Sequence, residues 1–346
     1  MWLEKMRLFR RLAPALVVCL GLTVGHSTQA IIHGLTFPGM AISTVKLSIQ
    51  HAHFLQSVEK WEYYDSICSA AIVGLKPLTL ITAAHCLKEV RVSGPQSLPV
   101  LSIAQPELLG IEQITLKHAF YRPFEAVSED LTQDIAVLVF DAKVQSLIRP
   151  LRIRVDDSLP DILMICGYGR GDSEADTRHP RCGERKPIRD LSDFYQVLPK
   201  AYREMDEMLH LQAQTQFAYT QELVHAEKAL VAVNRLNELN QYDHTMPMPT
   251  VGDSGGPWLV LNAKGQYELL AITSLVERFY NPSAHWPFFQ KQVPLSEYPY
   301  IAYGLRLSHP EVLGFLQYAQ HSGADIQFTS APLFRHGGRE SQSTDK

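Results

Sequence analysis

The run Val251-Gly252-Asp253-Ser254-Gly255-Gly256-Pro257 is the stretch around which this chain is organised. It places one hydroxyl between glycines and beside a carboxylate. Glycines allow backbone angles with positive φ and let another molecule approach the main chain closely. The run is too tight for ordinary secondary structure, so it predicts a loop that presents Ser254 to a ligand.

Composition bounds the kind of protein. The chain has 346 residues, enough for one large domain or two moderate ones. Hydrophobic residues make up 46% and charged residues 20%, which is typical of a globular protein with a substantial core. The net charge of −4 gives no broad basic surface, so we expect no nucleic-acid partner.

The first 30 residues have the pattern of a secretory signal peptide. Basic residues between Lys5 and Arg11 precede the apolar run Leu12 to Val24, and Thr28-Gln29-Ala30 is a small-x-small cleavage site. The alternative is a membrane anchor, but the apolar run is shorter than the roughly 20 residues that span a bilayer. We therefore expect a secreted or periplasmic protein with no stable membrane anchor once residues 1–30 are removed.

Cysteine usage agrees with export. Cys19 would leave with the signal peptide, and four cysteines remain, namely Cys68, Cys86, Cys166 and Cys182. An even number in an exported chain favours disulfides over free thiols. Four cysteines can pair in three ways, and the sequence alone does not show which pairing forms.

Three motifs together resemble the chymotrypsin/trypsin family of serine proteases. They are the run Gly252 to Pro257, the run Thr82-Ala83-Ala84-His85-Cys86, and Asp134 at the head of the apolar run Ile135 to Phe140. The resemblance implies an all-β fold of two antiparallel β-barrels with a C-terminal α-helix. It also implies catalytic roles: Ser254 as nucleophile, His85 as general base and Asp134 as the group that orients His85. The N–H groups of Gly252 and Ser254 would form the oxyanion hole.

The order of these residues separates two hydrolase folds. Gly252 to Gly256 also fits G-x-S-x-G, the nucleophile turn of α/β-hydrolases, where the acid and the histidine follow the serine. His285 and His309 do follow Ser254, which keeps that alternative formally open. The sequence lacks the alternation of parallel strands and helices that the fold needs, so we favour the order His85, Asp134, Ser254.

The same resemblance suggests how the cysteines and the new N-terminus pair. It implies a Cys68–Cys86 disulfide beside the histidine, and a Cys166–Cys182 disulfide between neighbouring strands of the second barrel. Cleavage after Ala30 would make Ile31 the first residue, in a sequence similar to the family's processed N-terminus. The family's freed α-ammonium pairs with the carboxylate before the serine, here Asp253, and no separate propeptide would be needed.

Substrate-binding residues follow from the resemblance as well. Met248 occupies the position six before the serine, at the base of the family's specificity pocket, while Ser274 and Val276 lie on its edge strand. Met248 carries no charge that could attract Lys or Arg. The expected substrate side chain is therefore neutral, apolar and small to medium in size.

The resemblance also divides the mature chain, with a protease domain over 31–328. The first barrel would cover about 31–155 and the second about 160–305, joined by a linker at Asp156 to Pro160. Ser308-His309-Pro310-Glu311 has a cap residue, an early proline and a glutamate three after the cap, which predicts a helix over about 309–321. Residues 329–346 are polar and are expected to form a tail.

Residues 190–250 depart from the family. Leu209 to Tyr219 alternates well enough to predict a strand, and the apolar spacing within Glu222 to Leu239 predicts an amphipathic helix. We expect this helical insertion to be structural cover rather than a lid or an additional binding site.

The remaining expectations concern partners. His51 and His53 lack a third ligand at suitable spacing, so we expect no metal, and nothing in the sequence calls for a cofactor. The predicted partner is a protein or peptide substrate, and the predicted state is a monomer. The alternative function is a protease-like binding protein with little or no turnover.

Overall fold

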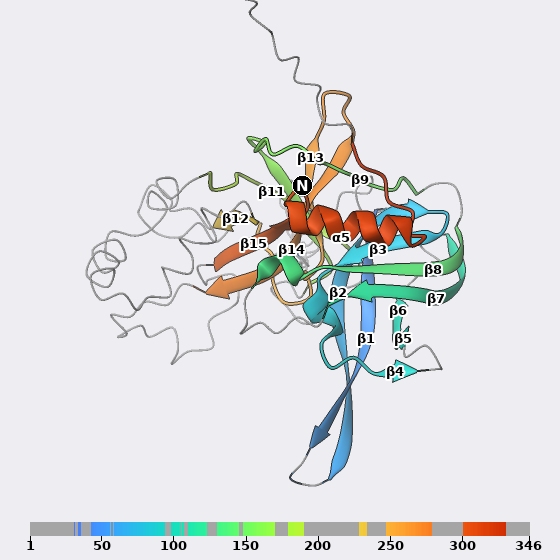
Figure 1. The fold of residues 1–346 in the computed structure, drawn as a ribbon. Helices are drawn as coiled ribbons and strands as arrows, with labels where there is room; N and C mark the ends of the chain where they lie inside the picture. Colours follow the sequence, from blue (N-terminus) through green and yellow to red (C-terminus); the bar gives the residue numbers. More distant parts are fainter. Residues whose placement is uncertain are drawn as a thin grey trace, which may run out of the picture.

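The computed structural model describes residues 31, 34–35, 43–55, 57, 59–93, 98–104, 106, 110–122, 130–144, 148–169, 179–189, 228–233, 247–278 and 300–329. Within these residues the chain forms two large antiparallel sheets and one α-helix (Figure 1). No helix among them is both long and apolar enough to cross a membrane.

The first sheet has the strand order β6-β1-β2-β3-β8-β7. Its strands are β1 (Thr44–Leu55), β2 (Lys60–Leu75), β3 (Leu78–Thr82), β6 (Leu101–Ile103), β7 (Ile111–Tyr121) and β8 (Ala136–Val144). Alternating residues of β1 are buried, as the polar–apolar alternation of Thr44 to Gln50 predicts. Their apolar side chains pack into one core with Ile72, Leu80 and Leu138. A separate two-stranded sheet pairs β4 (Val92–Ser93) with β5 (Leu98–Pro99).

The second sheet has the order β11-β10-β13-β14-β15-β12. Its strands are β10 (Leu163–Gly167), β11 (Arg181–Arg185), β12 (Ala229–Val233), β13 (Pro257–Leu261), β14 (Tyr267–Arg278) and β15 (Tyr300–Arg306). A short strand, β9 (Arg152–Ile153), pairs in parallel with β14. Trp258 is fully buried in this sheet, where its indole N–H donates to the hydroxyl of Thr273 at 2.9 Å.

These two curled antiparallel sheets, followed by helix α5 (Pro310–His321), confirm the predicted fold class. The α/β-hydrolase alternative is wrong, because that fold needs a parallel sheet with helices between its strands. In the described part of the chain the sole parallel pairing between named strands is the two-residue contact of β9 with β14.

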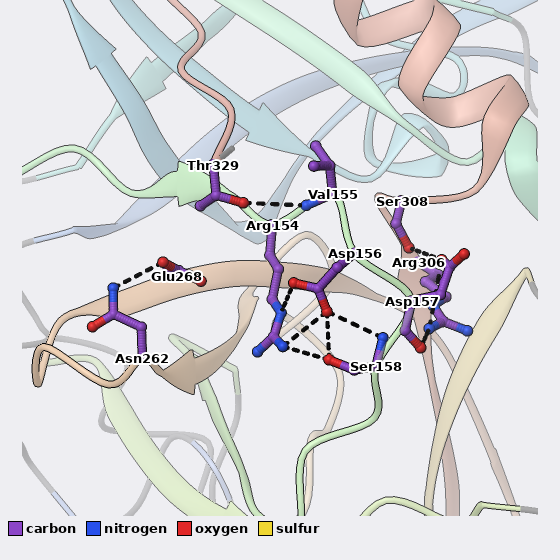
Figure 2. A network of polar contacts seen from close by, with 10 residues as sticks. All are labelled: Arg154, Val155, Asp156, Asp157, Ser158, Asn262, Glu268, Arg306, Ser308 and Thr329. Atoms are coloured by element: carbon purple, nitrogen blue, oxygen red, sulfur yellow. Dashed lines mark hydrogen bonds and ion pairs between the residues drawn. The ribbon is translucent and has the colours of Figure 1, made fainter. Parts of the chain in front are cut away.

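The linker between the sheets is held by charged groups on both sides (Figure 2). Asp156 accepts hydrogen bonds from Arg154 Nε at 2.7 Å and from the amide of Ser158 at 3.1 Å. Arg306, at the end of β15, donates to the main-chain carbonyl of Asp157. The predicted linker at Asp156 to Pro160 therefore carries two ion pairs, one with the neighbouring Arg154 and one with Arg306 of the second sheet.

The predicted cap of the C-terminal helix is wrong in its residue. His309 occupies the N-cap position and its side chain makes no capping bond. Ser308 instead donates its hydroxyl to Asp157 at 3.0 Å, and Glu311 accepts from Thr132 at 2.9 Å (Figure 2 shows the Ser308 contact). Contacts with distant segments have replaced the local capping box.

The predicted helix over 222–239 is wrong where the structure describes it. Ala229–Val233 forms β12, which pairs with β15 and buries all five residues. A short apolar run cannot be assigned to helix or strand by its spacing alone, and pairing with β15 decides it here. The other residues of that range, and the predicted strand at 209–219, lie outside the described residues.

Three segments outside the predicted second barrel contact the second sheet. Leu35 forms a bridge with Cys182 of β11, so this N-terminal segment contacts the second sheet. Strand β9 also belongs to that sheet, although both segments were expected within the first barrel. Thr329, expected in the tail, donates its amide to Ile153 at 2.8 Å.

Candidate active site

The loop Val251 to Gly256 lies where the two sheets meet. The amide of Ser69 in β2 donates to the carbonyl of Ser254 at 2.8 Å. On the other side, the amide of Gly255 donates to Thr273 of β14 at 2.7 Å, and the amide of Thr273 donates to Gly256 at 2.8 Å. The loop is thus bonded to one strand of each sheet, which fixes the main chain on both sides of Ser254.

Gly255 allows this close fit. Its φ is +78°, and a Cβ atom there would lie 2.1 Å from Thr82 Oγ1 and 2.4 Å from the carbonyl oxygen of Ser69. Any other side chain would both strain the backbone and collide with β2 and β3. The second glycine of the motif is therefore required by packing against the first sheet.

His85 lies on the short 3-10 helix η1 (Ala84–Leu87), which directly follows β3. The next residue, Cys86, forms a disulfide with Cys68 of β2. A single turn has little stability of its own, so this covalent bond and the contacts of His85 must hold it in place. The other implied disulfide, Cys166–Cys182, is also present and joins directly opposed residues of β10 and β11.

Asp134 holds His85 at two points. Nδ1 of His85 lies 2.9 Å from one carboxylate oxygen of Asp134, and the main-chain amide of His85 donates to the other at 2.8 Å. Asp134 is fully buried at the end of the 3-10 helix η3 (Leu131–Gln133), just before β8. A carboxylate accepts only, so Nδ1 carries a proton, and in the neutral imidazole Nε2 carries the lone pair.

Ser274 completes the polar shell of Asp134. Its hydroxyl donates to the carboxylate oxygen of Asp134 that also faces Nδ1. The register of β14 against β15 shifts between Thr273 and Leu275, which makes Ser274 the extra residue of a β-bulge. Bulges re-aim side chains, and this one turns a residue of the second sheet toward an aspartate of the first.

The pKa of His85 is raised above its ordinary value of 6.5. Burial acts to lower it, but the negative charge of Asp134 and the hydrogen bond to that carboxylate outweigh burial. The imidazolium form is therefore favoured by its surroundings, which suits a group that must take up a proton.

An open cleft of about 450 Å³ brings the predicted residues together. Its walls include His85, Ser254 and Gly252, together with the Cys68–Cys86 disulfide. Ser254 is half-buried and Val251 beside it is 69% exposed, so the loop faces solvent at the cleft.

Ser69 is a structural residue of this site that the sequence analysis missed. It is fully buried, and its hydroxyl donates to the carbonyl of Gly252 at 2.9 Å while accepting from the amide of Tyr168 at 2.8 Å. Its amide bonds Ser254, as described above. Ser69 therefore fixes the main chain on both sides of Asp253, and its position directly after Cys68 was the signal available in the sequence.

Asp253 is fully buried beside Ser254 but points away into the second sheet's core. Its carboxylate accepts from the amides of Gly169 at 2.6 Å and Thr250 at 2.8 Å. A Cβ at Gly167 would lie 2.1 Å from this carboxylate, so the sequence Cys166-Gly167-Tyr168-Gly169 makes room for it. Burial outweighs both hydrogen bonds and raises the pKa of Asp253 to about 8.

Ile31, the proposed partner of Asp253, is fully buried in the second sheet's core. It packs in the same cluster as Ile165, Trp258 and Met248. Among the described residues of the intact chain, no cationic group pairs with the carboxylate of Asp253.

The predicted pocket residues lie near one another. Met248 is 1% exposed within the cluster that contains Ile31, and Val276 of β14 packs against the same cluster. Ser274 is turned to Asp134, as described above. The segment that follows β14, residues 279–299, lies outside the described residues.

His51 and His53 have structural partners. Nδ1 of His51 lies 2.8 Å from the carbonyl oxygen of Lys88, and Nε2 lies 2.6 Å from the hydroxyl of Ser66. His53 forms an exposed contact with Glu89 at 3.2 Å. Within the described parts of the chain, no three metal-binding side chains gather at one point.

Comparisons with known proteins give a structural likeness only. No family model matches the chain, and no curated protein matches it. Solved structures do match, among them one described as HL collagenase at 1.7 Å resolution. It is 16% identical, the match covers 84% of this chain and 98% of that one, and the TM-score is 0.42.

Proposed function

We propose that this chain is a serine endopeptidase that cleaves peptide bonds through an acyl-enzyme. The observation that carries the proposal is the placement of His85. Its Nδ1 is held by a buried carboxylate, and its ring lines the same cleft as Ser254. A serine hydroxyl is a weak nucleophile unless a base removes its proton during attack, and this arrangement supplies the base.

The steps follow from these positions. Ser254 Oγ attacks the peptide carbonyl while His85 Nε2 takes its proton, and Asp134 stabilises the imidazolium that forms. His85 then gives the proton to the departing amine, which leaves Ser254 acylated. Water, activated by His85, releases the acid and restores the hydroxyl.

The amides of Gly252 and Ser254 would stabilise the oxyanion. Among the described residues neither amide donates to another protein group, whereas those of Asp253, Gly255 and Gly256 all do. Losing one such donor typically slows an enzyme by about 10²- to 10³-fold. Ser69 supports these donors by fixing the carbonyls of Gly252 and Ser254.

Maturation and specificity are part of the same proposal. Export with removal of residues 1–30 fits the two disulfides, which form in oxidising compartments. Ile31 would then supply an α-ammonium to the buried Asp253. Met248 and Val276 favour a neutral, small to medium apolar substrate side chain over Lys or Arg.

An active-site fluorophosphonate probe tests the proposal. The exported protein should label stoichiometrically at Ser254, whereas Ser254→Ala, folded to the same extent by circular dichroism, should not label. A peptide-library cleavage profile should then show apolar residues before the cut. Folded wild type that resists labelling as completely as Ser254→Ala would instead be the protease-like binding protein.

A further inference from the structure

We propose that Glu311, in the first turn of α5, is a positioning residue of the active site. It holds the side chain of Thr132 and, through the turn of η3, sets the main chain of Asp134. The inference rests on the proposed peptidase function, because it concerns the carboxylate that orients the general base. It adds a contact from α5, which lies outside the three motifs of the site.

Asp134 stands at a sharp turn between η3 and β8. It is the C-cap residue of η3, with φ −80° and ψ 53°, and its amide donates to Leu131 at 3.0 Å. The amide of Ile135 donates to the carbonyl of Gln133 at 2.8 Å, which makes Asp134 the central residue of an inverse γ-turn. The direction of the Asp134 side chain therefore depends on where η3 ends.

The turn of η3 has little stability of its own. It consists of three residues, and forming a single turn fixes several dihedral angles for one hydrogen bond. Asp130 caps it by accepting from the amide of Thr132 at 3.2 Å, but this contact lies within the same segment. The position of η3 relative to β8 and His85 must therefore be set by contacts with other elements.

Within the described residues, two polar contacts join η3 and its cap to other elements. Lys228 Nζ lies 3.4 Å from a carboxylate oxygen of Asp130, and both side chains are partly exposed. Thr132 is only 5% exposed, and its hydroxyl donates to Glu311 Oε2 at 2.9 Å. Exposed ion pairs contribute little, whereas a hydroxyl bonded to a carboxylate makes a charge-assisted hydrogen bond. The contact between Thr132 and Glu311 is therefore the stronger of the two.

Helix α5 is a firm support for this contact. Its fully buried residues pack in the same core cluster as Leu131 of η3; they are Val312, Leu316 and Ala319. Glu311 occupies the first turn, where the helix dipole favours a negative charge. The two elements are in contact, and Figure 1 shows the start of α5 beside η3. Glu311 thus joins η3 to an element whose place is set by the core.

Loss of the Glu311 carboxylate would release η3 from α5. The hydroxyl of Thr132 would then bond water or a main-chain carbonyl of its own turn, and neither partner belongs to α5. The turn would shift relative to β8, and the carboxylate of Asp134 would move with it. The contact of that carboxylate with His85 Nδ1, at 2.9 Å, would weaken as a result.

The first test compares Glu311→Ala with Glu311→Gln. The alanine variant should lower kcat about three- to tenfold, as expected for one hydrogen bond. It should leave KM nearly unchanged, because neither Glu311 nor Thr132 lines the cleft. The apparent pKa of His85 should also fall, since burial lowers it and the charge of Asp134 raises it. Glu311→Gln keeps an acceptor oxygen at the same length and should match wild type in both respects.

The second test changes the other partner. Thr132→Val removes the hydroxyl and keeps the shape of the side chain, whereas Thr132→Ser keeps the hydroxyl. Thr132→Val should reproduce the effects of Glu311→Ala, and Thr132→Ser should stay close to wild type. The double variant Glu311→Ala/Thr132→Val should be no worse than either single one, because both changes break the same contact. If Glu311→Ala does not fold, the two Thr132 variants decide the question.

Gln320→Ala is the control for a purely structural effect. Gln320 donates to the carbonyl of Ile326 at 2.6 Å, so this change also removes one side-chain hydrogen bond of α5, but at its other end. It should lower Tm about as much as Glu311→Ala does, and leave kcat and the apparent pKa of His85 unchanged. All rates are measured at a temperature where every variant is folded by circular dichroism.

Two outcomes would overturn the proposal. One is a lower Tm in Glu311→Ala with no change in kcat or in the apparent pKa of His85, which would make Glu311 structural only. The other is a Glu311→Gln variant as impaired as Glu311→Ala, which would show that the hydrogen bond is not what matters. NMR titration of His85 in a Ser254→Ala background needs no turnover. If wild type hydrolyses no peptide, the proposed function fails, while that titration in Glu311→Ala still decides whether Glu311 positions Asp134.

Discussion

Asp134 is a buried residue whose contacts come from three separate segments. Two of them hold its carboxylate, namely η1, through the ring and the amide of His85, and the bulge of β14, through Ser274. The third is η3, where the main-chain amide of Asp134 donates to Leu131. A buried charge needs such partners, because desolvation is otherwise costly. Asp130, four residues earlier, instead caps η3 by accepting from the amide of Thr132.

Asp134→Asn should lower the pKa of His85, because the charge and hydrogen bond that raise it are weakened while burial remains. In wild type, kcat/KM should rise with pH through an apparent pKa above 6.5, since the base must be neutral. The variant should lose about 10⁴-fold in kcat through the wrong imidazole tautomer. NMR titration of His85 and a pH–rate profile measure both effects.

Asp130→Asn is the control for this experiment, because Asp130 lies four residues away and bonds only the start of η3 and Lys228. It should cost about 1 kcal/mol of stability at most and leave the titration of His85 in place. An unchanged His85 pKa in Asp134→Asn would contradict the coupling.

Gly255→Ala should destabilise the fold by about 3 kcal/mol or more, because the new Cβ combines a positive φ with a collision against Thr82 and Ser69. Gly265→Ala is a matched control, since its φ is +71° but nothing lies within 4 Å of the added atom. It should cost only the backbone strain, about 1 kcal/mol. Urea denaturation measures both, and equal losses would show that packing against the first sheet is unimportant.

At the scale of elements, strands with a clear pattern could be predicted and short or tertiary-dependent elements could not. The alternation of polar and apolar residues predicted β1, and the apolar run that follows Asp134 predicted β8. β12 was mistaken for helix because its pairing with β15, some 70 residues later, is invisible to local spacing. The predicted capping box does not form for a similar reason. The side chain of Ser308 bonds Asp157, and that of Glu311 bonds Thr132, both in distant segments.

The helix η1 carries His85, the proposed general base, and is joined to β2 by the Cys68–Cys86 disulfide. Removing it with Cys68→Ala/Cys86→Ala should lower the free energy of unfolding by about 3 kcal/mol, as expected for a loop of this length. It should also lower kcat/KM at temperatures where the protein is still folded, because η1 carries His85. Denaturation curves and activity on one preparation separate the two effects.

Cys166→Ala/Cys182→Ala provides the comparison, because it opens a loop of nearly the same length in the second sheet. Its loss in free energy of unfolding should be similar, while the apparent pKa of His85 in the pH–rate profile should equal that of wild type. If both double variants shift that pKa equally, η1 does not depend on its own disulfide.

At the scale of the whole molecule, the candidate site exists only because two sheets meet. The motifs identified His85, Asp134 and Ser254, yet the contacts that join them come from residues without a motif. Ser69 bonds the nucleophile loop to β2, the bulge at Ser274 reaches Asp134, and Arg154 and Arg306 fix the linker (Figure 2). Such long-range contacts depend on the assembled fold, which explains why sequence patterns found the catalytic candidates but not their supports.

The ionisation of Asp253 should make the stability of the intact chain depend on pH. Its pKa in the folded intact chain is about 8, above its ordinary value of 3.8, so the folded state holds a proton that the unfolded state releases. Stability of the intact chain should therefore fall as pH rises from about 4 to about 8. Asp253→Asn should remove this contribution. Urea denaturation across that range, in a Ser254→Ala background that prevents self-cleavage, measures it.

The processed chain should lack this pH dependence. If Ile31 is the first residue, its α-ammonium can pair with Asp253, which keeps the carboxylate ionised and removes the loss of stability between pH 4 and 8. Mass analysis should find Ile31 at the N-terminus of the exported protein. Asp65→Asn, which alters an exposed carboxylate, should change neither curve. Identical pH dependence in the intact and processed chains, or full activity with a longer N-terminus, would show that Ile31 and Asp253 do not pair. Asp253 would then be a buried acid that stays neutral below about pH 8, held by Gly169 and Thr250 alone.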